Sequence, residues 1–197
     1  MAPSRRYKRL VSRLERLRQH FLPAQFSPTG MYGARDQDLA RGYLVLVHAE
    51  IEAYCEDRSE AVARRAHERW KRNGRLGKTL RGLISFHNVQ NRQPWKAIDR
   101  APNRVDAAVQ SYLSVITQNH GIKEENICKM LFPIGIEIRE LDNVWLATID
   151  SFGTMRGTIA HKSVIAQQAV DPATEYTRLT NQILPGLRKL DRKISDL

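Results

Sequence analysis

An arginine and a histidine stand five positions apart, at Arg156 and His161, in a stretch that reads as a helix. Cleaving RNA without a metal requires a group that transfers protons near neutral pH, and the unperturbed pKa of histidine lies there. It also requires a fixed cation to bind the scissile phosphate, for which the planar fork of arginine is suited. Because an offset of five turns two helical side chains about 140° apart, the pair would flank a groove.

Three further side chains are candidates to support this pair. Glu50 could orient a catalytic histidine, as carboxylates often do. The alternative is a buried acid in a salt bridge with Arg41 or with another helix. His48 is a second candidate, and its alternative is a histidine packed in the core or between helices. Asp150 precedes Arg156 by nearly two helical turns, and it is a candidate to pair with that arginine or to close the groove.

Other common kinds of site have no pattern in the sequence. P-loop, GxGxxG, HExxH and GxSxG motifs are absent. Glu50 and Glu52 would point about 200° apart on a helix, which excludes a paired-carboxylate site. Cys55 and Cys128 stand alone without metal-ligand spacing, which fits a reducing cytoplasm and leaves a disulfide between them open. We therefore expect no cofactor and no metal.

The N-terminus is basic but lacks the apolar segment of a signal peptide, and no apolar run approaches 18 residues. We therefore expect a cytoplasmic protein without membrane contact.

Positive charge is spread unevenly along the chain. The formal net charge of 32 − 21 = +11 lies entirely in residues 1–136, because residues 137–197 hold equal numbers of basic and acidic side chains. Two basic runs, over residues 5–18 and 64–81, suit a polyanion such as nucleic acid. The alternative is a solvated helix face that serves solubility. The candidate RNA-binding residues of the second run are Arg64, Arg65, Arg69, Lys71, Arg72 and Arg75.

The elements that must position these residues are helices, because apolar residues recur at three- and four-residue steps along most of the chain. The first half of the chain is predicted to contain a helix over 5–21, a loop over 23–33, and a long helix from Asp36 or Asp38 to 73 that bends near Ser59. A short helix over 77–86 and a polar loop over 88–102, which contains Trp95, are predicted to follow. The second half is predicted to contain a helix from Asn103 to 121, a short helix over 123–132, a helix over 141–163 and a final helix over 172–194.

Local signals define several boundaries of these helices. Ser4 is predicted to cap the first helix, and Asp171-Pro172 the last. Pro185 predicts a kink within the last helix. The only β-like run is short, over residues 134–138. The predicted fold class is therefore all-α.

The segment from Trp145 to His161, WLATIDSFGTMRGTIAH, resembles the signature helix of HEPN domains, in particular the RiboL-PSP-HEPN branch. Residues 40–54 (ARGYLVLVHAEIEAY), 122–132, Asp171-Pro172 and 184–187 (LPGL) fit the same branch in the same order. The resemblance covers most of residues 36–194. One departure is Gly157, because many family members have a polar residue directly after the arginine.

The resemblance implies a HEPN-like helical bundle with additional short helices, homodimerisation, and metal-independent RNA cleavage by an R-x4-6-H motif. The motif residues would be Arg156 and His161. Such domains recur in toxin–antitoxin, abortive-infection and antiviral systems, so an antitoxin or another defence protein is an implied partner. We expect a single domain over 1–197, with a basic helix and loop over 1–35 and the HEPN-like core over 36–194.

The resulting functional hypothesis is an endoribonuclease that acts as a toxin or defence effector and leaves a 2′,3′-cyclic phosphate. One alternative is a non-catalytic HEPN subunit that binds RNA or serves as a scaffold in a defence complex. The other is a helical DNA-binding regulator, for which no helix-turn-helix pattern is evident. Since each chain has one histidine in the motif, we expect a two-fold dimer to bring two motifs together. Gly153 and Gly157 would then lie at or near its interface.

Overall fold

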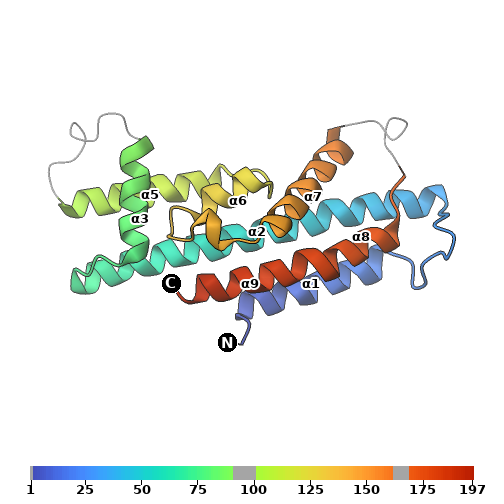
Figure 1. Ribbon diagram of the computed structural model, residues 1–197, viewed down its shortest axis with the longest axis horizontal. Helices are drawn as coiled ribbons and strands as arrows, with labels where there is room; N and C mark the ends of the chain where they lie inside the picture. Colours follow the sequence, from blue (N-terminus) through green and yellow to red (C-terminus); the bar gives the residue numbers. More distant parts are fainter. Residues whose placement is uncertain (1, 91–100, 162–168) are drawn as a thin grey trace. The chain divides into compact units, whose positions relative to one another are not determined.

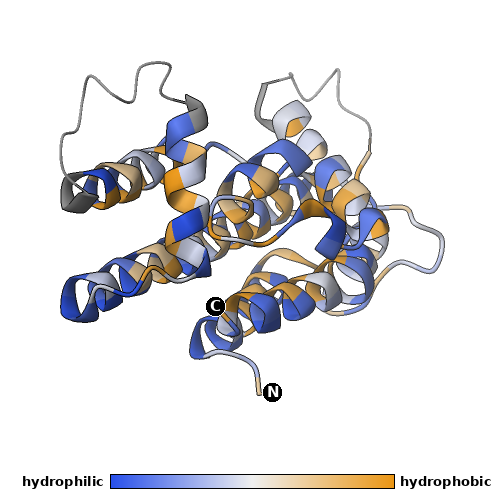
Figure 2. Ribbon diagram, turned by 60° about the vertical axis from the view of Figure 1, so that its left-hand side comes forward, coloured by the Kyte–Doolittle hydropathy of each residue, from blue (hydrophilic) through white to orange (hydrophobic). Residues whose placement is uncertain are grey.

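The computed structural model describes residues 2–90, 101–161 and 169–197, and these residues contain helices but no β-strand (Figure 1). The predicted all-α fold is confirmed. Figure 2 shows hydrophilic and hydrophobic residues alternating along the helices, as the spacing in the sequence predicts. The helices are α1 (Arg5–Phe21), α2 (Ala34–Asn73), α3 (Lys78–Gln90), α5 (Ala101–Thr117), α6 (Glu124–Leu131), the 3-10 helix η1 (Ile138–Glu140), α7 (Asn143–His161), α8 (Pro172–Arg178), the π-helix η3 (Leu179–Ile183) and α9 (Leu184–Ser195).

The predicted capping residues act as caps. The Ser4 hydroxyl oxygen accepts from the backbone N–H of Tyr7, and Asp171 accepts from the N–H of Ala173, at 3.1 Å in each case. α2 ends at Asn73, and the next residue, Gly74, has a φ of +67°, which favours glycine. These boundaries were predictable because each depends on residues within a few positions of the helix end.

Some predicted boundaries were wrong. The predicted loop over 88–102 is shorter at both ends, because α3 continues to Gln90 and α5 begins at Ala101 instead of at Asn103. Pro102 does not break the start of α5, since the first N–H groups of a helix have no helical acceptor. Residues 91–100, with Trp95, lie outside the described part of the chain. The β-like run at 134–138 forms no strand and leads into η1.

Pro185 is accommodated by a π-helical turn. The N–H of Leu184 donates to the carbonyl of Leu179, five residues earlier, so the hydrogen-bonding pattern widens just before the proline that has no N–H to donate. The kink that the sequence predicted at this proline stays a prediction.

Contacts between residues divide the chain into two compact units. Unit 1 comprises Met1–Tyr54, Gly121–Glu124 and Leu141–Arg192, and unit 2 comprises Cys55–His120, Glu125–Glu140 and Lys193–Leu197. α2 contributes its first part to unit 1 and its second part to unit 2. The single domain over residues 1–197 stays a prediction. No helix of the described residues has a stretch long and apolar enough to cross a membrane.

A buried carboxylate links three helices of unit 1. Asp191 of α9 is 1% exposed and accepts from the hydroxyl of Ser4, next to α1, at 2.6 Å and from the hydroxyl of Tyr54 of α2 at 2.9 Å. α1 and α9 lie side by side in Figure 1. In unit 2, α3 packs against α5, and the buried hydroxyl of Tyr112 donates to the carbonyl of Met130.

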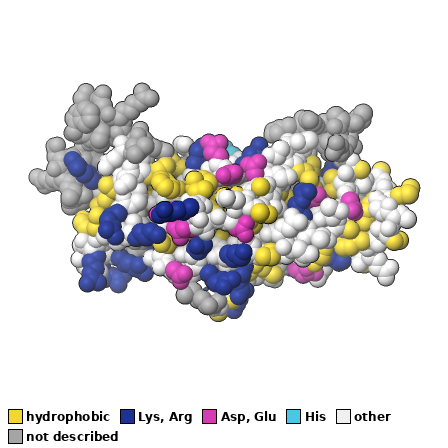
Figure 3. Space-filling model, viewed as in Figure 1, with side chains coloured by type: hydrophobic (Ala, Val, Ile, Leu, Met, Phe, Trp, Pro, Cys, Tyr) yellow, Lys and Arg dark blue, Asp and Glu magenta, His cyan; other side chains and the backbone are white. Residues whose placement is uncertain are grey.

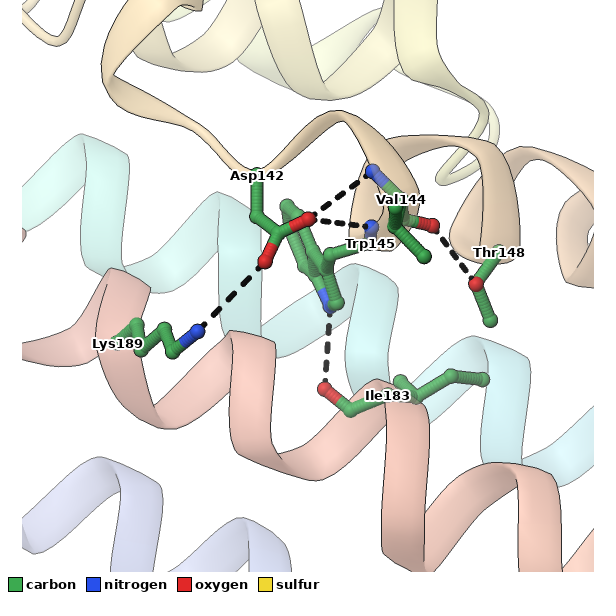
Figure 4. Close-up of polar contacts among 6 residues, drawn as sticks. All are labelled: Asp142, Val144, Trp145, Thr148, Ile183 and Lys189. Atoms are coloured by element: carbon green, nitrogen blue, oxygen red, sulfur yellow. Dashed lines mark hydrogen bonds and ion pairs between the residues drawn. The ribbon is translucent and has the colours of Figure 1, made fainter.

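The first turn of α7 is anchored by polar contacts within unit 1 (Figure 4). One oxygen of Asp142 accepts from the N–H groups of Val144 and Trp145, at 3.0 and 3.2 Å, and the other lies 3.6 Å from Nζ of Lys189. The indole N–H of Trp145 donates to the carbonyl of Ile183, in the π-helical turn, at 3.1 Å. These contacts fix the beginning of the helix that carries Arg156.

Candidate functional site

Arg156 lies in the C-terminal part of α7 and is half-buried. Its Nε atom is buried and forms no hydrogen bond with any residue of the described ranges. A buried, charged donor without an acceptor is costly, which indicates a site that an anionic ligand could complete. His161 is the last residue of α7, and its side chain lies outside the described part of the chain. The groove between Arg156 and His161 therefore stays a prediction.

His48 of α2 lies in the neighbourhood of Arg156. Its side chain is 2% exposed, and its ring stacks on Phe152 of α7 with ring centroids 6.3 Å apart. Burial, and secondarily the positive charge of Arg156, lower the pKa of His48 from 6.5 to about 4. His48 is therefore a neutral imidazole at neutral pH, packed in the core beside the candidate catalytic arginine.

Glu52 is the carboxylate closest to this histidine, and the sequence interpretation did not select it. Its Oε2 lies 3.5 Å from Nδ1 of His48, but Nδ1 has no hydrogen bond to a described residue. Because the low pKa keeps His48 neutral, we regard this contact as close packing and not as an ion pair. The spacing of the two residues, four apart on a helix, was the signal that could have identified the pair.

The other two predicted supporting residues make contacts elsewhere in unit 1. Glu50 Oε1 pairs with Nε of Arg13 of α1 at 2.8 Å, so the salt bridge to another helix is the alternative that the structure favours. Arg41 pairs instead with Asp38. Asp150 accepts from the backbone N–H of Glu124 at 3.1 Å. Of the three candidates, the structure brings only His48 near Arg156.

The two glycines of α7 have different surroundings. A Cβ added to Gly153 would lie 3.1 Å from Cγ and 3.3 Å from the backbone nitrogen of Lys123. The backbone of Lys123 therefore approaches this glycine closely within the chain itself. A Cβ added to Gly157 would meet no described atom within 4 Å. No described residue therefore packs against that side of α7 at Gly157.

A family model described as RiboL-PSP-HEPN matches residues 8–196. The chain belongs to the RiboL-PSP-HEPN family. No curated protein and no solved structure matches the sequence significantly. HEPN domains are often ribonucleases and often dimerise, so family membership supports a ribonuclease or RNA-binding role.

The predicted RNA-binding residues of this HEPN protein lie in unit 2. Arg64 is paired with Glu60 at 2.6 Å, and Lys71 lies 3.9 Å from Asp106. Burial, followed by repulsion from Arg58 and Arg69, lowers the pKa of Arg65. Arg69 and Arg75 line a cavity, and Arg72 is exposed. A basic surface that leads from these residues to Arg156 stays a prediction.

Part of the N-terminal basic run of the HEPN chain serves packing within unit 1. The guanidinium of Arg18 lies 5.6 Å from the ring centroids of both Phe26 and Tyr176. Among the described residues, no group of three or more His, Cys, Asp or Glu side chains could hold a metal ion. Cys55 is buried and Cys128 half-buried, and no disulfide joins them.

Proposed function

We propose that this HEPN protein is a metal-independent endoribonuclease, acting as a toxin or as an antiviral or abortive-infection effector. It cleaves RNA through Arg156 and His161. The observation that carries the proposal is the buried Nε of Arg156, which has no partner among the described residues and lies on the helix that ends at His161. The family match over residues 8–196 supports the same interpretation.

The reaction is a transesterification in which the phosphorus exchanges its bond to the 5′-oxygen for a bond to the ribose 2′-oxygen. The ribose 2′-oxygen attacks the phosphorus while a base removes the 2′ proton, and the 5′-oxygen leaves with a proton from an acid. The products are a 2′,3′-cyclic phosphate and a 5′-hydroxyl end. Arg156 binds the phosphate oxygens, whose negative charge grows in the transition state.

The reaction needs two proton-transferring groups, and each motif has one histidine. His48 is a poor second group, because a pKa of about 4 makes it a weak base and leaves it without a proton to donate at neutral pH, and because its side chain is buried. We therefore assign the second group to His161 of a second copy in a two-fold dimer. No described atom would lie within 4 Å of a Cβ at Gly157, which is compatible with a partner or RNA beside Arg156.

The test is cleavage of RNA by the purified chain in EDTA. Replacing Arg156 or His161 with alanine should lower the cleavage rate at least about a hundredfold, because each change removes a transition-state contact or a proton-transfer group. Matched controls are Arg139→Ala and His20→Ala, which change exposed residues of the same types. Full activity of either motif variant would contradict the assignment.

Mixing experiments test the shared site. Mixed dimers of wild-type and His161→Ala chains should have much lower activity than the same amount of wild-type chain alone, because each mixed dimer lacks one proton-transfer group. Full-rate cleavage by a strictly monomeric form would exclude a site shared between two chains.

A non-catalytic RNA-binding or scaffolding role in a defence complex is the second candidate, and Gly157 is the observation that favours it. A polar side chain that many family members have next to the arginine is missing here. RNA binding without any cleavage in EDTA, and without any effect of His161→Ala, would support this second role.

A further inference from the structure

Unit 2 contains a cavity of about 430 Å³ between the end of α2 and the beginning of α3. Figure 3 shows Lys and Arg side chains gathered over this part of unit 2, on the left of the view, where Figure 1 shows α2 ending and α3 beginning. The polar lining residues of the cavity are Arg69, Asn73, Arg75, Lys78, Thr79 and Asp196.

The cations of this cavity form no salt bridge with a described acidic side chain, although Lys78 lies close enough to Glu140 to help lower the pKa of that carboxyl. Arg69, Arg75 and Lys78 are exposed, and none of them forms a salt bridge with a residue of the described ranges. Nη1 of Arg69 donates to the main-chain oxygen of Leu197, the last residue of the sequence, at 3.4 Å. Asp196 is the acidic side chain among the described lining residues, so the lining side chains carry 3 − 1 = +2.

The neighbouring residues on α2 reinforce this excess of positive charge. Arg65 lies close enough to Arg58 and Arg69 for their charges to lower its pKa, together with its partial burial. By contrast, Arg64 is neutralised by Glu60 at 2.6 Å. Positive charge is therefore concentrated toward the cavity and not spread evenly along the helix.

The backbone of the cavity is held in place by local contacts. The side-chain oxygen of Asn73 accepts from the N–H of Arg75 at 3.0 Å, which fixes the turn after α2. Gly77 precedes α3 and has no side-chain oxygen to accept from the N–H groups of its first turn. Thr79 in that turn is 5% exposed and contributes a hydroxyl to the lining.

These features define the chemistry of a ligand. Two guanidinium forks and an ammonium suit the oxygens of a phosphate, which arginine binds through two parallel hydrogen bonds. None of the described lining residues is aromatic, so a base has no ring to stack on. The volume lies within the range of about 300–1,000 Å³ that is typical of ligand sites.

We propose that this cavity binds a phosphate group of RNA without reading the base, with Arg69, Arg75 and Lys78 as its cationic ligands. The inference rests on RNA being the ligand in the proposed function. It selects Lys78 from the second basic run and adds Asn73 and Thr79 to the residues that would bind RNA. The phosphate is either an internal phosphodiester or a terminal monophosphate of the strand.

The experiment measures binding of a short 2′-O-methyl oligouridylate to the full chain, since RNA without a free 2′-OH cannot be cleaved by the proposed reaction. The double variant Arg69→Gln/Lys78→Gln should bind about tenfold more weakly at low salt. Its slope of log K against log salt should be shallower by about 0.7 for each phosphate that the variant no longer binds. The charge-retaining variant Arg69→Lys/Lys78→Arg should keep the slope of the wild type.

The matched control is Arg139→Gln/Lys129→Gln, which removes the same charges from exposed positions of unit 2 outside the cavity. Equal decreases in affinity for 5′-phosphorylated and 5′-hydroxyl oligonucleotides support an internal phosphate, and a decrease confined to the 5′-phosphorylated strand supports a terminal one. A decrease no greater than that of the control overturns the inference. The test measures binding and not cleavage. It therefore decides the phosphate site independently of whether the protein is a nuclease.

Discussion

The two halves of α7 differ in how tightly they are held. In the N-terminal half, Asp142 caps the helix, and Trp145, Ile149 and Phe152 are at most 5% exposed. In the C-terminal half, residues 155–159 are all half-exposed, and a side chain at Gly157 would touch nothing within the described residues. The N-terminal half of α7 is thus packed in the core, whereas residues 155–159 of its C-terminal half are partly exposed.

This difference explains how one helix can both position and expose a reactive side chain. Arg156 lies one turn after Phe152, so its backbone is fixed by a buried neighbour. Next to it, a Cβ at Gly157 would meet no described atom within 4 Å. A fixed backbone combined with a buried Nε that has no acceptor among the described residues suits the binding of an anionic ligand.

Loosening the packed half should give the largest effect on stability. Trp145→Ala removes a buried ring and its hydrogen bond to Ile183, and we expect it to lower the free energy of unfolding by about 4 kcal/mol. Urea unfolding followed by circular dichroism measures this change. A decrease below about 1 kcal/mol would show that the contrast between the two halves is wrong.

Gly186 sharpens the same test, because a Cβ at this position would overlap the ring of Trp145. Gly186→Ala alone should be strongly destabilising. In the Trp145→Ala background the same change should become neutral or stabilising, since the overlap is gone and alanine favours a helix. Additive effects of the two changes would contradict the proposed contact between α7 and α9.

The stability of the protein should depend on pH through His48 of α2, which packs against Phe152 in the middle of α7. Its folded pKa of about 4 lies below the ordinary 6.5, so between these values the unfolded chain binds a proton that the folded chain does not. Stability should therefore fall as the pH drops from about 6.5 toward 4, by up to about 3 kcal/mol from this group. Urea midpoints measured across this pH range test the prediction.

His48→Gln, which cannot be protonated, should remove most of this pH dependence, whereas His20→Gln at an exposed position should keep it. Glu52 and Arg156 are the charged groups beside His48, so the measured pH dependence also includes their interactions with its ring. An unchanged slope in His48→Gln would show that other groups cause it.

The sequence predicted what depends on short stretches of chain. Ser4, Asp171-Pro172 and Gly74 define helix ends through contacts a few residues away, and the apolar spacing defined the helices between them. The start of α5 was misplaced because Asn103 resembles a cap, while Pro102 is tolerated in a first turn.

The surroundings of the site depend on contacts that no local pattern contains. His48 meets Phe152 and Arg156 only because α2 packs against α7 within unit 1. Glu50 pairs with Arg13 for the same kind of reason, across two helices. The pair Arg156 and His161 could be selected from its spacing, but its neighbours could not be selected without the packing of the helices.

A substitution in the C-terminal half of α7 should give the smallest change in stability. Gly157→Ala meets no described atom within 4 Å, so the change should stabilise the protein by about 0.5–1 kcal/mol through the helix preference of alanine. Gly153→Ala, against Lys123 at 3.1 Å, should gain less or lose stability, which makes it the matched control. Urea midpoints of both variants should be measured at low and high protein concentration. Gly157→Ala could instead destabilise the protein only at the concentration where the chain dimerises. That result would show that a second copy covers the surface at Gly157. The contrast between the two halves of α7 would then hold for the monomer alone.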